Sequence, residues 1–225
     1  MQTHETLRPC ILEEAYEVMD AIDEGSPEHL YDELGDMLLQ IALHVEIGRK
    51  HGEFDASDVA TAICEKMIHR HTHVFGGDRA GDAGEVLGLW SKNKMAERGQ
   101  NSRAEAMRDI TRTLPATLRA AKLFKRAGEA GLGEVDEAAA VETCRARVDA
   151  CLSSGVTEAH IGDAMMTLCN LARLSGVDPE IALDRACRRF IDRFDAVEQK
   201  IRAEGRDFED LPAETLRKYW DLVKL

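Results

Sequence analysis

The 225-residue sequence contains few aromatic side chains, only 5% of the chain, and only five prolines. It also lacks sustained alternation of β-branched or aromatic residues with polar ones, which argues against a β protein. Alanine, leucine, methionine and glutamate are frequent instead, and these residues favour helices. The composition therefore predicts an all-α protein, and 44% apolar residues suffice for a packed core.

Long apolar runs and paired cysteines are missing as well. Because no stretch of about 18 apolar residues occurs, we expect no membrane span. The first residues lack the charged and apolar regions of a signal peptide. The six cysteines form no C-x-x-C pair and have no histidine cluster beside them, so a zinc or redox site is not expected. These absences predict a soluble, cytoplasmic protein with reduced thiols.

Positive charge is also scarce. Aspartate and glutamate number 42 against 29 lysines and arginines, which gives a formal net charge of −13. Binding to long nucleic acid is not expected, because neutralisation of phosphates dominates its affinity. A small phosphorylated ligand remains compatible with this charge, since bound divalent cations can reverse the local sign.

Apolar periodicity and capping residues outline the helices of the first half. We expect a first helix at about residues 6–23, a second from Pro27 to about His51, and a third that ends at about His71. Ser26 and Asp55 are placed to cap the second and third helices. A glycine-containing loop and a short helix around Trp90 follow.

Three short patterns of the first half recur in the second, in the same order and at offsets between 123 and 130 residues. This recurrence predicts a duplicated helical unit of roughly 100 residues. We expect one copy at residues 1–98, a polar linker at 99–113 and a second copy at 114–225. The recurring patterns are Leu34-Gly35-Asp36 with Ile161-Gly162-Asp163, Lys66 and Arg70 with Arg189 and Arg193, and Trp90-x-x-x-Lys94 with Trp220-x-x-x-Lys224.

Carboxylates at helical spacing are the most informative feature of the first copy. Glu14 and Glu17 share a face of the first expected helix, and Glu33 and Asp36 share a face of the second. The short turn between the helices makes them antiparallel neighbours, so the two pairs can converge. The alternative is an ordinary solvated face, and the Glu14–Glu17 pair alone would favour it.

The composition of the second helix favours a metal site over a solvated face. Apolar residues point almost all round it from Leu34 to Ile47, which predicts a buried helix. A carboxylate there, such as Asp36, is costly unless it is paired, protonated or metal-bound. With no basic residue expected near these acids, a hard divalent cation is the partner we expect, and oxygen ligands favour Mg²⁺ or Mn²⁺. A helical di-iron site would need Glu-x-x-His motifs, which these two helices lack.

Basic and aromatic residues of the third helix and beyond suit a phosphorylated ligand. Lys66 and Arg70 are four residues apart and could contact phosphates, with a solvated face as an equally weighted alternative. Trp90 either stacks on a base or fills a core, and the core is slightly favoured. The alternating histidines fan around a helix end, so we interpret them as surface or fold-specific residues: His69, His71 and His73.

The acidic motif resembles that of a known family. Leu12-Glu13-Glu14-Ala15-Tyr16-Glu17, followed by Asp32-Glu33-Leu34-Gly35-Asp36, is similar to the E-E-x-x-E…E-x-x-D signature of MazG-type nucleoside triphosphate pyrophosphohydrolases. Residues 70–76 resemble the family's R-R-H-P-H-V-F-G segment, and Leu114-Pro115 with residues 119–126 resembles the start of its second domain. The resemblance covers nearly the whole chain.

This resemblance implies a duplicated four-helix-type fold, a tightly intertwined homodimer and Mg²⁺-dependent cleavage of nucleoside triphosphates between the α- and β-phosphates. The products would be the monophosphate and pyrophosphate, and removal of non-canonical nucleotides is one possible role. By position, it implies that Glu13 is an acid that either supports the metal ligands or orients water. It also implies nucleotide contacts at Lys66, Arg70 and Trp90. The implied metal ligands are Glu14, Glu17, Glu33 and Asp36.

Two departures from the family pattern matter. In the family, a C-P-W-D segment precedes the stretch that corresponds to Gln2-Thr3-His4, and this segment is missing here. Either the start codon is misassigned or the segment has been lost. Its absence predicts weaker contacts with the substrate. In the second copy, His160-Ile161-Gly162-Asp163 replaces E-x-x-D, and a cationic stretch, residues 144–149, replaces E-E-x-x-E. We therefore expect the metal site in the first copy only. The alternative is a non-catalytic dimer that senses nucleotides or binds a partner.

Overall fold

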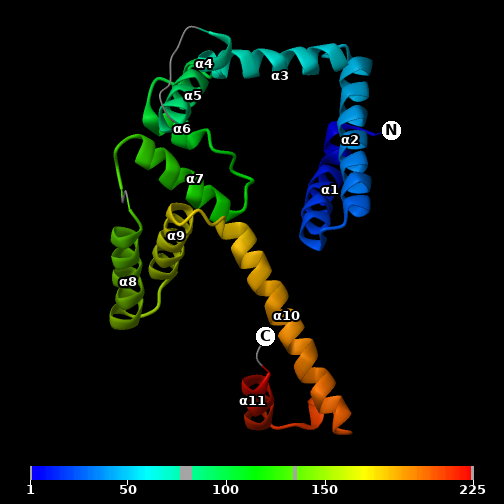
Figure 1. Cartoon of the computed structure of the whole chain (residues 1–225), viewed down its shortest axis with the longest axis vertical. Helices are drawn as coiled ribbons and strands as arrows, with labels where there is room; N and C mark the ends of the chain where they lie inside the picture. Colours follow the sequence, from blue (N-terminus) through cyan, green and yellow to red (C-terminus); the bar gives the residue numbers. More distant parts are fainter. Residues whose placement is uncertain (1, 77–82, 134–135, 224–225) are drawn as a thin grey trace. The chain divides into compact units, whose positions relative to one another are not determined.

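The computed structural model describes residues 2–76, 83–133 and 136–223. These residues form eleven α-helices and one short 3₁₀ helix, with no strand among them (Figure 1). The all-α prediction is therefore confirmed. The chain divides into two compact units, Met1–Arg98 and Gly99–Leu225. None of the described helices is long and apolar enough to cross a bilayer.

The first unit begins with a helical hairpin of α1 (His4–Glu24) and α2 (Pro27–His51). Gly25, with a φ of 68°, ends α1 in the left-handed region, where a side chain would be strained. The Ser26 side chain accepts a hydrogen bond from the His29 amide, and Pro27 takes the first helical position. This tight turn places α1 and α2 side by side in antiparallel directions.

A second group of helices follows in the same unit: α3 (Ala56–Arg70), α4 (Thr72–Phe75) and α5 (Ala83–Glu97). Asp55 caps α3, and the Asp58 side chain accepts a hydrogen bond from the Asp55 amide in return. The ring of Phe54 packs on Gly48 of α2, where an added Cβ would lie within 2.8 Å of three ring atoms. Helix α5 contains 15 residues, so the helix around Trp90 is longer than expected.

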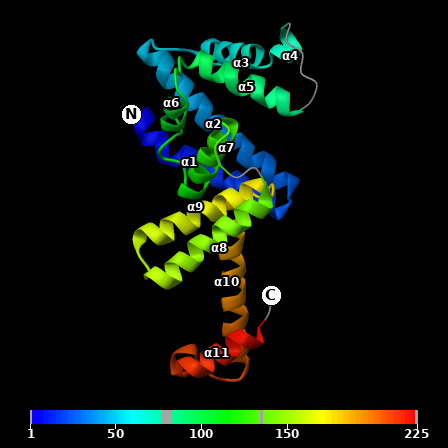
Figure 2. The ribbon, with the colours of Figure 1, turned by 90° about the vertical axis from the view of Figure 1, so that its left-hand side faces the viewer.

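The second unit starts with α6 (Arg103–Arg108), which lies in the stretch expected to be a linker. Helix α7 (Ala116–Glu129) packs along α9 (Glu158–Leu174), and α9 forms a hairpin with α8 (Glu137–Ser154) (Figure 2). The long helix α10 (Pro179–Ala203) leads to a 3₁₀ turn (Phe208–Asp210) and α11 (Ala213–Leu222). A small core joins these last elements: Val197, Ile201, Leu211 and Tyr219.

The two units share an arrangement of helices. Each has a hairpin, α1–α2 or α8–α9, followed by a helix whose arginine lies over a tryptophan ring. The Arg70 guanidinium is 5.5 Å from the centroid of Trp90, and that of Arg193 is 4.2 Å from the centroid of Trp220. On this basis we propose that the units are copies of one ancestral unit.

Helix α2 differs from its prediction, because it is not buried within the single chain. Its buried residues are Gln40, Ile47 and Gly48. Leu34 is 51% exposed and Leu38 is 65% exposed. The reason is that α1 covers only one side of α2, so the opposite apolar side faces outward.

Candidate metal site

Three carboxylates converge on the α1–α2 hairpin. Glu14 and Glu17 lie three residues apart on α1, and Glu33 lies near the start of α2. Each offers one oxygen atom, and the three oxygens all lie within 4.8 Å of one another. The helical spacing and the tight Gly25-Ser26 turn bring the acids together, because they place residues of both helices on facing sides. We call Glu14, Glu17 and Glu33 the acid cluster.

The carboxylates of the acid cluster repel one another when they are ionised. The pKa of the Glu17 carboxyl is raised, first because its ionised form is partly desolvated and then because it faces Glu33 and Glu14. Adjacent carboxylates resist simultaneous ionisation unless a cation screens them. All three donors are oxygens, which are the ligands that hard divalent cations such as Mg²⁺ and Mn²⁺ prefer. The donor set therefore fits a magnesium-type ion.

A buried glutamine supports the cluster from α2. Gln40 is 7% exposed, and its Nε2 donates a hydrogen bond of 3.0 Å to Oε1 of Glu14. Sequence reasoning did not assign this role, although Gln40 lies one turn after Asp36 on a helix that is otherwise apolar. A polar residue in that position could have indicated the contact. The bond fixes one oxygen of Glu14, so Gln40 is a positioning residue for the acid cluster.

A histidine also reaches the cluster, contrary to the expectation that no basic residue lies near the acids. His29 Nε2 is 2.9 Å from Oε1 of Glu33, and its Nδ1 is 2.7 Å from Oε2 of Glu24. The pKa of His29 is raised, first by the hydrogen bond to Glu24 and then by Glu33. His29 and Glu33 are four residues apart on α2, so the helical spacing itself could have revealed this pair.

Two acids of the predicted site lie outside the cluster. Glu13 and Asp36 are both exposed, and neither belongs to the group of close oxygens. Asp36 lies three residues beyond Glu33, so it follows by less than one helical turn. The roles assigned to both acids stay predictions.

The predicted nucleotide contacts lie on α3 and α5. Arg70 forms a two-point ion pair with Glu97, from Nε to Oε2 at 2.8 Å and from Nη2 to Oε1 at 3.0 Å. Lys94 Nζ lies 4.8 Å from the ring centroid of Trp90, the ring that Arg70 also covers. Lys66 is exposed. Arg70 and Trp90 are therefore engaged in joining α3 to α5.

The single chain keeps these residues apart from the acid cluster. Glu33 lies 18 residues before His51 at the end of α2, a distance of about 27 Å along the helix axis. Helix α3 begins beyond that far end, as Figure 1 shows. Lys66 and Arg70 thus lie away from the turn that gathers the acids.

The histidines after α3 have local partners. His71 Nδ1 lies 2.8 Å from the carbonyl oxygen of Met67. The rings of His71 and His73 are 5.8 Å apart and tilted by 54°. These contacts agree with a role of the two residues in the fold.

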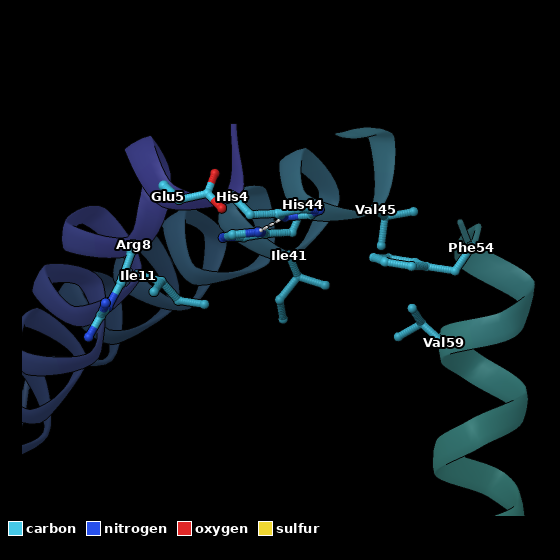
Figure 3. A pocket seen from close by; sticks show the side chains of 9 residues that line it. All are labelled: His4, Glu5, Arg8, Ile11, Ile41, His44, Val45, Phe54 and Val59. Atoms are coloured by element: carbon cyan, nitrogen blue, oxygen red, sulfur yellow. Dashed lines mark hydrogen bonds between the residues drawn. The ribbon is translucent and has the colours of Figure 1, made fainter. Parts of the chain in front are cut away.

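The same hairpin also carries an apolar cavity of about 550 Å³ (Figure 3). The rings of His4 and His44 stack with centroids 5.0 Å apart, and their Nδ1 atoms are 2.7 Å apart. Phe54 and Val59 also line this cavity. None of the clustered acids lines it, so we treat it as a feature separate from the acid cluster.

A helical hairpin that presents three clustered carboxylates on an all-α scaffold defines a class of proteins suited to phosphate chemistry through a hard cation. Residues 2–75 match the MazG nucleotide pyrophosphohydrolase domain. The chain is 36% identical to the nucleoside triphosphate pyrophosphohydrolase of Escherichia coli, over 99% of this chain and 88% of that protein. It therefore belongs to the MazG nucleotide pyrophosphohydrolase family.

Two further relatives carry similar names. The nucleoside triphosphate pyrophosphohydrolase/pyrophosphatase MazG of Thermotoga maritima is 34% identical, over 99% of this chain and 87% of that protein. The nucleoside triphosphate pyrophosphohydrolase of Mycolicibacterium smegmatis is 32% identical, over 95% of this chain and 57% of that protein. Similarity to the first two relatives thus extends through both units.

Proposed function

We propose that this protein hydrolyses nucleoside triphosphates to nucleoside monophosphates and pyrophosphate with the help of Mg²⁺. The observation that carries the proposal is the acid cluster on the hairpin of a MazG-family chain. All six cysteines are free thiols, which supports a cytoplasmic location. Removal of non-canonical nucleotides is the cellular role that we propose.

The acid cluster would hold the metal. Glu14, Glu17 and Glu33 supply three carboxylates, and we propose Asp36 as a fourth ligand. Bound Mg²⁺ would supply charge neutralisation and polarisation of the phosphate oxygens. Glu13, next to Glu14 on the exposed side of α1, would orient the attacking water. Gln40 holds Glu14 in one orientation, so it limits the reorganisation that binding requires.

The substrate contacts would come from α3 and α5. We propose that the exposed ammonium group of Lys66 contacts the phosphates. Arg70 is held by Glu97 and covers Trp90, so it would present the tryptophan ring to the nucleotide and add positive charge nearby. Because these residues lie away from the acid cluster in one chain, a complete site needs a second copy or a rearrangement of α3.

A homodimer would also cover the open side of the hairpin. Several apolar residues on α2 and α3 are exposed in the part of the chain that the structure describes, and exposed apolar patches mark interfaces. We propose that a second copy packs on them. They include Leu34, Leu38, Ile41, Val59, Ile63 and Met67.

Sedimentation velocity tests the dimer. Leu38→Glu places a charge on this surface and is expected to shift the protein from dimer to monomer, because a buried unpaired charge is costly. Leu132→Glu is the matched control, since Leu132 is also largely exposed but lies outside this surface. A dimer that persists in Leu38→Glu would overturn the proposed interface.

Pyrophosphate release from a panel of nucleoside triphosphates tests the activity. The expected result is release with Mg²⁺ and none with EDTA. Among the described residues, the second unit has no cluster of acids like that of the first unit, which favours the other candidate function, a non-catalytic dimer that senses nucleotides. Binding of triphosphates without pyrophosphate release under any divalent cation would establish that alternative.

A further inference from the structure

Helices α7 and α9 of the second unit enclose a cavity of about 710 Å³. This volume lies within the range of small-molecule sites, about 300–1,000 Å³. The cavity lies within one compact unit and is separate from the acid cluster on α1 and α2. Nothing in the proposed reaction uses it.

One part of the cavity lining is apolar and adaptable. It consists of Leu123 of α7 and of Met165, Met166 and Cys169 of α9. Methionine side chains are flexible and polarisable, so they adapt well to flat aromatic rings. Burial raises the pKa of the Cys169 thiol, which keeps that group neutral. This lining suits a planar heterocycle.

The other part of the lining is polar and carries both signs of charge. Arg119 lies on the α7 side, and Glu158 and Asp163 lie on the α9 side. Arg119 donates one hydrogen bond from Nη1 to the carbonyl oxygen of Arg112 at 3.2 Å. A guanidinium has five N–H groups, so others can bind a phosphate. The two carboxylates can accept hydrogen bonds from the amino groups of a base.

The charged residues of the cavity lining bear on how many phosphate groups a bound nucleotide can carry. Asp163 has a protein partner, since Nη1 of Arg147 lies 3.8 Å from its Oδ2 across the α8–α9 hairpin. Glu158 adds a further negative charge. A triphosphate without a metal would bring its large negative charge close to these carboxylates, whereas a monophosphate brings much less. One arginine therefore suits a monophosphate.

We propose that the cavity between α7 and α9 binds a nucleoside monophosphate without a metal ion. The base would lie against Leu123 and Met166, and the phosphate would contact Arg119. The proposal rests on the proposed function in one respect, namely that the ligand is of the same class as its product. The second unit would then sense the product that the first unit releases.

Calorimetric titration of the full chain in EDTA with AMP, GMP, CMP and UMP tests the proposal. We expect saturable binding of at least one monophosphate at one site per chain. Arg119→Glu should weaken this binding by about 10- to 100-fold, because a charge-assisted contact is lost and a repulsion is added. Met166→Trp should abolish it by filling the cavity. Lys125→Glu is the matched control, with the same charge change on α7 outside the lining.

Three outcomes would overturn the proposal. Absence of binding up to millimolar monophosphate is the first. Binding that Glu33→Gln removes is the second, since it would place the ligand at the acid cluster. The third is a change of oligomeric state in Arg119→Glu, measured by sedimentation, because a second copy would then occupy the cavity. None of these measurements needs turnover, so failure of the proposed hydrolysis would be recognised separately.

Discussion

The hairpins α1–α2 and α8–α9 differ in the charged groups that lie between their two helices. The first gathers Glu14, Glu17 and Glu33 and leaves their mutual repulsion for a cation to relieve. The second has the ion pair of Arg147 and Asp163 across its two helices. In the second hairpin a guanidinium of the chain itself therefore faces a carboxylate, whereas the first hairpin has three acids together. The two hairpins thus have a similar arrangement of helices but different charged groups between them.

The helices that follow the hairpins differ in the same way. Arg70 is anchored by the carboxylate of Glu97, whereas Nη2 of Arg193 donates to the backbone carbonyl oxygen of Trp220. Both arginines cover a tryptophan. In each unit the contact joins two helices, α3 and α5 in the first and α10 and α11 in the second, so it contributes to their packing. In the first unit, the arginine is therefore anchored by a group whose charge depends on pH.

The largest expected effect comes from removing an acid of the first hairpin. Glu33→Gln should lower the rate of pyrophosphate release on the order of a hundredfold, because metal-bound charge stabilisation is lost. Asp163→Asn in the second hairpin should leave the rate unchanged. The comparison fails if Asp163→Asn inactivates a chain whose circular dichroism shows an intact fold.

A second change would restore acids to the second hairpin. The double variant Arg147→Glu, His160→Glu would face Asp163 with two new carboxylates. We expect one additional Mn²⁺ to bind per chain, because oxygen donors on neighbouring helices suit that ion. Electron paramagnetic resonance of free Mn²⁺ during a titration measures the stoichiometry. An unchanged stoichiometry in the folded variant would show that more than these charges separates the hairpins.

The hydrogen bond from Gln40 should matter less than the acids. Gln40→Leu removes the donor to Glu14 while it keeps a similar volume, and the affinity for Mn²⁺ should fall by about 10- to 100-fold. Thr167 is the residue 127 positions later, and its hydroxyl donates to the carbonyl oxygen of Ala164. Thr167→Val should not alter Mn²⁺ affinity. Equal effects of the two variants would contradict the positioning role of Gln40.

The smallest expected effect is a difference in acid sensitivity between the units. The hydrogen bond from Arg70 holds the pKa of the Glu97 carboxyl below its ordinary value of 4.5. The stabilisation by this pair is therefore fully present above pH 4.5 and is lost as the pH falls through the lowered pKa of the folded state. Glu97→Gln should remove this part of the acid dependence of thermal unfolding. If the unfolding temperature of Glu97→Gln falls at low pH just as that of the wild type does, the pair contributes no stability.

Much of the fold follows from local patterns. The caps at Ser26 and Asp55, together with Gly25, fix where α1 ends and where α2 and α3 begin, and the apolar period sets their lengths. These signals act over a few residues, so they can be seen in the sequence. The exposure of one side of α2 could not be predicted in the same way. Apolar periodicity indicates which side of a helix is buried, but it does not indicate whether the same chain or another molecule packs against that side.

The sequence by itself determined the spacing of Glu14, Glu17 and Glu33 and the tight turn between their helices, because helical geometry converts both into a common face. Only the tertiary structure decided which groups touch these acids and which stay away. Gln40 meets Glu14 across 26 positions of the chain, and Arg70 meets Glu97 across 27. Such pairings depend on how helices pack against one another, and no local pattern records that packing.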